Sequence, residues 1–146
     1  MKAFHFPLDS VLNWRETQSE REDEKLSRSL AELNRCELLK AKNDEARSTA
    51  SKSQLQVGGV SGSDFRALGA YLLGLDVSAD LLRGEVVKCQ HRIQQQQALC
   101  LAARRAVKLL DLLKAKRKTA WLHEVDREAE NAASENYLGR RARNLV

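Results

Sequence analysis

Apolar residues recur with a period of seven along the second half of the chain. One series consists of Leu68, Leu75, Leu82, Cys89, Gln96, Ala103 and Leu110. A second, interleaved series consists of Leu72, Ala79, Val86, Ile93, Cys100 and Val107. Twelve of these thirteen positions are apolar, and Gln96 is the exception. A seven-residue repeat of this length predicts a helix that packs against a partner helix in a left-handed supercoil.

The first part of the chain has a weaker form of the same pattern. Between Pro7 and residue 55 there is no other proline and no glycine, and the segment is rich in good helix formers, which predicts one helix over about 7–55. The apolar residues at heptad spacing are Leu12, Leu26 and Leu33. Polar residues interrupt the row at Arg15, Ser19 and Glu22. We therefore expect a thin seam, meaning the row of residues that faces the partner helix.

A turn is predicted between these two helices, at about residues 56–64. The stretch QVGGVSGSD gathers three glycines among small polar residues, which ends a helical pattern. Ser61 followed by Asp64 resembles a capping box, so the second helix is expected to begin at about residues 62–64 and to run to about 140. Asp9 similarly favours the start of the first helix.

The expected fold is all-α: a single coiled-coil domain over residues 1–146, built as a long antiparallel two-helix hairpin whose second helix overhangs the first. A short turn requires antiparallel packing, which brings Cys36 to about the level of Cys89. An alternative architecture pairs long helices between two chains, and the sequence leaves it open.

Composition argues against an enzyme with a deep pocket. Charged residues make up 31% of the chain and aromatic residues 5%, which suits solvated helices better than a globular core. His5, His91 and His123 are far apart, and no catalytic motif or phosphate-binding loop occurs. The three cysteines form no CxxC pair, so we expect reduced thiols acting as small apolar side chains. We expect no cofactor and no metal site.

The chain also lacks signals for membranes or secretion. No run of about 20 apolar residues occurs, and MKAFHFPLDS has no apolar signal-peptide region. The expected location is the cytosol.

Positive charge concentrates in residues 101–120, here called the basic stripe. It contains seven basic residues and one acidic residue, a net charge of +6, whereas the whole chain carries +5. Such a stripe is able to track phosphates, so a nucleic-acid-binding helical hairpin is one hypothesis. No aromatic residues are interleaved with these charges, as single-strand binders require, so a nucleic-acid partner is disfavoured.

The start of the chain resembles a known family. Residues 4–16 read F-x-F-P-L-D-x-V-L-x-x-R-E, and residues 127–143 read REAENAASENYLGRRAR. Together with the helix–turn–longer-helix layout, these stretches resemble FliJ, a soluble component of the flagellar protein export apparatus.

The resemblance implies an antiparallel coiled-coil stalk, similar to the paired helices of the rotary shaft in ATP synthase. Its termini would enter the pore of the hexameric export ATPase, FliI, and its turn end would reach the export gate protein, FlhA. The resemblance further implies help in delivering export chaperones, and a position on the cytoplasmic face of the inner membrane. The equivalent stalk of an injectisome is a second interpretation.

Candidate partner-binding residues follow from this resemblance. For the ATPase ring they are Phe4, Phe6, Trp14, Arg104, Arg105, Lys116, Arg117 and Lys118. For the export gate they are Tyr71, Leu75 and Ala79. The aromatic residues near the start have a purely structural alternative: Phe6 packs with Leu8 on the first turn, and Trp14 packs against Val107 or Leu110. Leu75 likewise falls on the seam.

Overall fold

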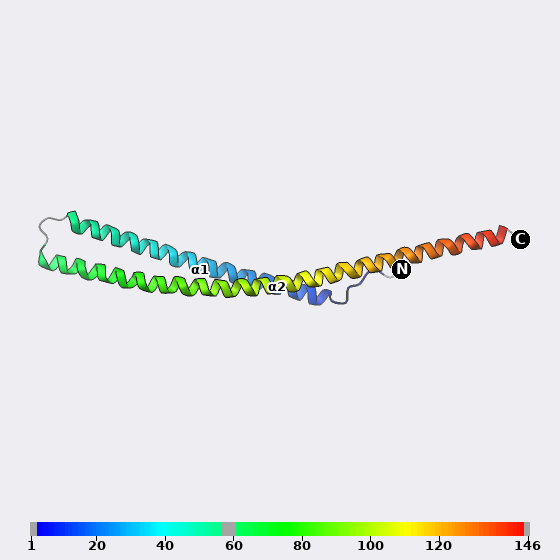
Figure 1. Cartoon of the computed structure of the whole chain (residues 1–146), viewed down its shortest axis with the longest axis horizontal. Coiled ribbons are helices and arrows are strands. Elements are labelled where there is room, and N and C mark those ends of the chain that lie inside the picture. Colours follow the sequence, from blue (N-terminus) through cyan, green and yellow to red (C-terminus); the bar gives the residue numbers. More distant parts are fainter. Residues whose placement is uncertain (1–2, 57–60, 145–146) are drawn as a thin grey trace. The chain divides into compact units, whose positions relative to one another are not determined.

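The chain folds into two long α-helices. The computed structural model describes residues 3–56 and 61–144, in which α1 (Asp9–Gln56) and α2 (Gly62–Asn144) occur and no strand does (Figure 1). The two helices pack against each other, which confirms the expected all-α hairpin. Residues 57–60 of the predicted turn lie outside the described residues.

A proline turn leads into α1. The backbone N–H of Asp9 donates to the carbonyl of Phe6 at 3.2 Å, so Pro7 occupies the second position of this turn, which its fixed φ favours. The carbonyl of Leu8 then accepts from the N–H of Leu12 at 2.8 Å and begins the helical bonding. Pro7 thus lies just before α1, two residues ahead of the helix start at Asp9.

Ser61 caps the start of α2. Its hydroxyl accepts a hydrogen bond from the backbone N–H of Asp64 at 3.3 Å and donates to the Asp64 carboxylate at 2.7 Å. The Ser61 carbonyl accepts from the N–H of Phe65 at 3.1 Å. These bonds satisfy N–H groups that an uncapped helix start leaves without partners. The capping interaction expected between Ser61 and Asp64 is present.

Contacts divide the chain into two units, and each unit contains part of both helices. Unit 1 comprises residues 1–19 and 102–146, and unit 2 comprises residues 20–101. Each is described by itself below.

In unit 2, α1 and α2 run antiparallel (Figure 1). Glu32 pairs with Arg92 at 3.3 Å, whereas Arg47, further along α1, pairs with Asp76, which lies further back along α2. The Arg47 guanidinium contacts both carboxylate oxygens of Asp76. All four side chains are about half exposed, so each pair contributes roughly 0–1 kcal/mol. Their main effect is to fix the alignment of the two helices.

The heptad positions of α2 face the partner helix, as predicted. All thirteen are buried or half-buried in their own unit. Ala79, Cys89, Ile93 and Cys100 are buried, with between 3% and 7% of their surface exposed. The apolar row that the sequence identified is therefore the α2 side of the seam.

The α1 side of the seam is half polar. In unit 2 its buried or half-buried seam positions are Glu22, Leu26, Ser29, Leu33, Cys36, Lys40, Asn43 and Ala50. Within the described part of the chain, the Asn43 side-chain oxygen is buried without a hydrogen-bond partner, which costs free energy. The pairing thus depends on apolar residues from α2 more than on those from α1.

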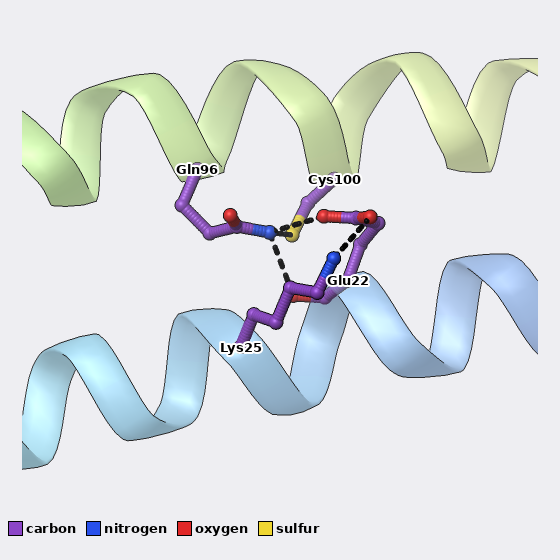
Figure 2. A network of polar contacts seen from close by, with 4 residues as sticks. All are labelled: Glu22, Lys25, Gln96 and Cys100. Carbon is purple, nitrogen blue, oxygen red and sulfur yellow. Dashed lines mark hydrogen bonds and ion pairs between the residues drawn. The ribbon is translucent and has the colours of Figure 1, made fainter.

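One polar layer crosses the seam in unit 2. The Gln96 amide donates to the Glu22 carboxylate and to the Glu22 backbone carbonyl, the latter at 3.1 Å (Figure 2). Lys25 pairs with the same carboxylate at 3.1 Å, and Cys100 lies 3.8 Å from the Gln96 amide nitrogen. The hydrogen bond from Gln96, followed by that from Lys25, lowers the pKa of Glu22 below its ordinary value of 4.5. The single polar position in the α2 repeat therefore meets a polar partner on α1.

Candidate partner-binding surfaces

Phe6 is the best buried large side chain in unit 1. Only 1% of its surface is exposed, and Leu12 of the same unit is 4% exposed. The charged groups of Lys114 and Arg117 lie over the Phe6 ring, 5.8 and 5.9 Å from its centroid. Their long aliphatic stems suit them to cover an apolar ring. Phe6 is thus a core residue that anchors the start of the chain to α2.

An ion pair reinforces this anchor. The Lys114 ammonium lies 2.7 Å from the Asp9 carboxylate, which also stands at the positive end of α1. The hydrogen bond to Asp9 raises the pKa of Lys114, although partial burial acts in the opposite direction. Asp111 and Glu16 add smaller attractions of the same sign. Lys114 and Arg117 of the basic stripe are therefore engaged within the unit.

Phe4 has an aromatic partner that the sequence did not reveal. Its ring centroid lies 5.8 Å from that of Trp121, with the planes tilted by 50°. Both residues are half-buried, and they line an open groove of about 440 Å³ together with Ala3, His5, Pro7, Arg117, Ala120 and Glu124. The roughly similar distances of Phe4 and Trp121 from the turn were the available signal.

Trp14 differs from the two phenylalanines because 56% of its surface is exposed. The Arg15 guanidinium lies over its ring, 4.9 Å from the centroid. Packing against Val107 or Leu110, the structural alternative, accounts at most for the covered part of this ring. The exposed part presents a large apolar surface to solvent, and Trp is a residue type that dominates binding energy at interfaces.

Six of the seven cations of the basic stripe are exposed, and one of them, Arg117, also lies over the Phe6 ring. Arg104, Arg105, Lys116, Arg117 and Lys118 are all exposed, and so is Lys108. Among the described residues, Arg105, Lys116 and Lys118 form no ion pair, whereas Arg104 makes an interaction within the chain. Leu109 and Leu112 lie among these charges and are 68% and 58% exposed. The surface is therefore mixed, with exposed leucines between cations, and the charge count alone did not show this.

The three candidate gate residues in unit 2 differ in exposure. Ala79 is 5% exposed and Leu75 is half-buried, so both face α1 in the seam. Tyr71 is 52% exposed. It borders an open groove of about 590 Å³ between the helices, whose other lining residues are Lys42, Glu45, Ala46, Thr49, Ala50, Ser53 and Leu68. Of the three, Tyr71 therefore has the most exposed side chain.

Further apolar residues of α2 in unit 2 are exposed on the face away from α1. Leu73, Val77 and Leu81 are 65%, 54% and 68% exposed and recur every four residues. Because they lie outside the heptad series, the sequence pattern gave them no role. Their spacing of four was the signal that could have identified a second apolar face.

Within the described part of the chain, no cluster of three or more His, Cys, Asp or Glu side chains is arranged to hold a metal ion. No described helix is both long and apolar enough to span a membrane.

The chain was compared with known proteins. No curated protein and no solved structure gave a match. Residues 4–140 match the family described as flagellar FliJ protein, which includes both the aromatic start and the basic stripe. Because this match covers nearly the whole chain, the protein belongs to the FliJ family and is a component of the flagellar export apparatus.

Proposed function

We propose that the protein is a non-enzymatic stalk that links the hexameric export ATPase, FliI, to the export gate protein, FlhA. Unit 1 binds the ATPase ring, and unit 2 binds the gate. The observation that carries this proposal is the exposed surface of unit 1, where unpaired cations and Trp14 accompany the family match. The matched family is flagellar, which favours this system over an injectisome.

The ATPase contact rests on exposed charge. Arg105, Lys116 and Lys118 are exposed and make no ion pair within the described residues. Acidic side chains lining the pore of a ring would face these cations in a confined space, where salt screens the attraction between the charges less than it does in bulk solution. The exposed side chains of Trp14, Leu109 and Leu112 would add apolar contact. Phe6, by contrast, contributes indirectly by holding the start of the chain in place.

Charge reversal tests the ATPase contact. The test variant exchanges Arg105, Lys116 and Lys118 for Glu, and it spares Arg117 because that side chain covers Phe6. We expect it to lose stimulation of the export ATPase while it keeps its helical content, since Glu, Lys and Arg have similar helix propensities. The matched control exchanges three exposed basic residues of unit 2, Arg21, Arg35 and Arg66, for Glu. The control should stimulate the ATPase as the wild type does, and equal stimulation by the test variant and the control would refute the contact.

The gate contact rests on Tyr71. Its exposed ring borders the groove whose α1 side consists mainly of small residues, so a partner's apolar side chain is able to pack against both. Tyr71→Ala should weaken binding to the soluble gate domain by about 2 kcal/mol or more, as truncation of an interface aromatic commonly does. Phe65→Ala is the matched control because Phe65 is 58% exposed and does not line this groove. Unchanged affinity of the Tyr71 variant would remove this residue from the interface.

A nucleic-acid partner for the basic stripe is the competing function. It predicts binding of random duplex or single strands with an affinity that falls steeply with salt. Such binding, together with no effect of the wild-type protein on the ATPase, would overturn the stalk assignment.

We further propose, from the family, that the protein assists in delivering export chaperones and works at the cytoplasmic face of the inner membrane. Recovery of export chaperones and FlhA with the wild-type protein, but not with the Tyr71 variant, would support this.

A further inference from the structure

Two cysteine side chains from opposite helices meet in the seam of unit 2. Cys36 on α1 is half-buried and Cys89 on α2 is 4% exposed, and both are free thiols. Cys36 is the neighbouring group that, after burial, contributes most to the raised pKa of Cys89. The ion pair Glu32–Arg92 places them independently at one level, because Cys36 lies one helical turn after Glu32 and Cys89 lies about one turn before Arg92. The antiparallel register thus holds two thiols side by side.

The third cysteine is held apart from this pair. Cys100 is buried in the Glu22–Gln96 layer (Figure 2). It lies eleven residues beyond Cys89 on the same helix, a rise of about 16 Å, whereas the Cα atoms of a disulfide lie within about 7 Å. A bond between Cys89 and Cys100 is therefore impossible in the folded protein.

The two thiols differ in burial, because Cys36 is half-buried and Cys89 is buried. Burial, followed by the neighbouring Cys36 thiol, raises the pKa of the Cys89 thiol, which disfavours its thiolate form. Because thiolate is the attacking species, the less buried Cys36 is the entry point for an external reagent and Cys89 acts second.

We propose that Cys36 and Cys89 form a reversible disulfide by exchange with a low-molecular-weight disulfide such as oxidised glutathione. The Cys36 thiolate attacks one sulfur of glutathione disulfide, forms a mixed disulfide and releases one glutathione thiolate. Cys89 loses its proton to solvent and attacks the Cys36 sulfur, which releases the second glutathione. Two protein thiols are oxidised, and one glutathione disulfide is reduced to two thiols.

This bond would tie α1 to α2 at a weak part of the seam. Lys40 and Asn43 follow Cys36 on α1, so few apolar contacts secure the helices there. A cross-link also closes the chain between residues 36 and 89 into a loop, which restricts the unfolded state. The oxidised protein should therefore melt at a higher temperature than the reduced one.

The test uses the full chain in its folded state. The protein is incubated in buffers of oxidised and reduced glutathione, alkylated, and mapped by mass spectrometry. We expect the three free thiols to fall to one, with a peptide linked through Cys36 and Cys89 and the loss of two hydrogen atoms. The melting temperature should rise, and dithiothreitol should reverse both changes.

Matched variants and a denatured sample separate this pairing from accidental oxidation. Cys36→Ser and Cys89→Ser should each abolish the cross-link and the rise in melting temperature, whereas Cys100→Ser should keep both. In urea, loop closure favours the short Cys89–Cys100 bond instead. The proposal is overturned if the folded protein gives the same mixture of bonds as in urea. It is also overturned if the reaction stops at a glutathione adduct of Cys36, or if oxidation links separate chains.

Discussion

Replacing Phe6 with Ala tests how the start of the chain is held in unit 1. The ring is 1% exposed and lies under Lys114 and Arg117, so the substitution removes a complete buried ring and the contact that both cations make with it. Removing a Phe side chain from a well-packed core costs about 3–5 kcal/mol. Each cation above the ring adds about 0.5–2 kcal/mol.

The measurable loss has an upper limit that the structure also sets. The α1 part of unit 1 extends only from Asp9 to Ser19, a short helical segment. When the cost of the cavity exceeds the free energy that docks this segment, the segment detaches and the rest of the chain stays folded. We therefore expect a loss of up to about 3–5 kcal/mol in local opening free energy, confined to unit 1.

Hydrogen exchange measures this loss directly. In Phe6→Ala, amides after about residue 12 on the α1 side of unit 1 should exchange much faster, while amides of α1 in unit 2 keep their protection. Tryptophan fluorescence is a second readout, because both tryptophans, Trp14 and Trp121, belong to unit 1. The control is Phe65→Ala, whose 58% exposed ring should cost about 0.5 kcal/mol or less. Unchanged exchange in unit 1 of the Phe6 variant would show that the ring does not anchor the chain.

Three other perturbations have clear expected outcomes. The Gln96 hydrogen bond lowers the pKa of Glu22 in the folded state, so the stability that this bond contributes is complete above the ordinary pKa of 4.5 and is lost as the pH falls through the folded-state pKa. The urea midpoints of the wild type and of Glu22→Gln should therefore converge in acid, and a difference that stays constant with pH would contradict this. Gly74→Ala and Gly84→Ala should each stabilise the hairpin by about 1 kcal/mol in thermal melts, since an added Cβ meets open space at both positions; a lower melting temperature would reveal a hidden clash. Cys100→Ala should lower the free energy of unfolding by about 1 kcal/mol or less, because the residue acts as a small apolar side chain. Protein export, measured through cell motility, should stay intact, and lost motility with the fold preserved would indicate thiol chemistry.

The strong repeat of α2 made its contact face predictable. Thirteen positions at regular spacing identify a helix face without knowledge of the partner, because period alone sets which side chains share a face. α1 could be predicted only in part. Ser29, Lys40 and Asn43 face α2 although their side chains are polar, and a polar residue in a weak repeat does not show on which side it lies.

The candidate sites were harder to predict than the fold. The sequence marked Phe6 and Arg117 as conspicuous residues but not as neighbours, because their contact depends on how the first residues turn back along α2. The exposure of Trp14 and the burial of Ala79 also depend on register. Register is set by particular pairs such as Glu22 with Gln96, and a pattern of apolar spacing defines it only to within whole heptads.

The unequal seam suggests a way to inhibit the protein. α2 contributes apolar residues at nearly every contact position, whereas α1 in unit 2 places Ser29, Lys40 and Asn43 opposite them. A synthetic peptide with the sequence of residues 20–50, but with Leu at these three positions, would bury more apolar surface on α2 than α1 itself does. Retaining Glu22 would keep the carboxylate that accepts the hydrogen bond from Gln96, and so would fix the register of the peptide on α2. At concentrations above the effective concentration of the tethered α1, such a peptide would displace it.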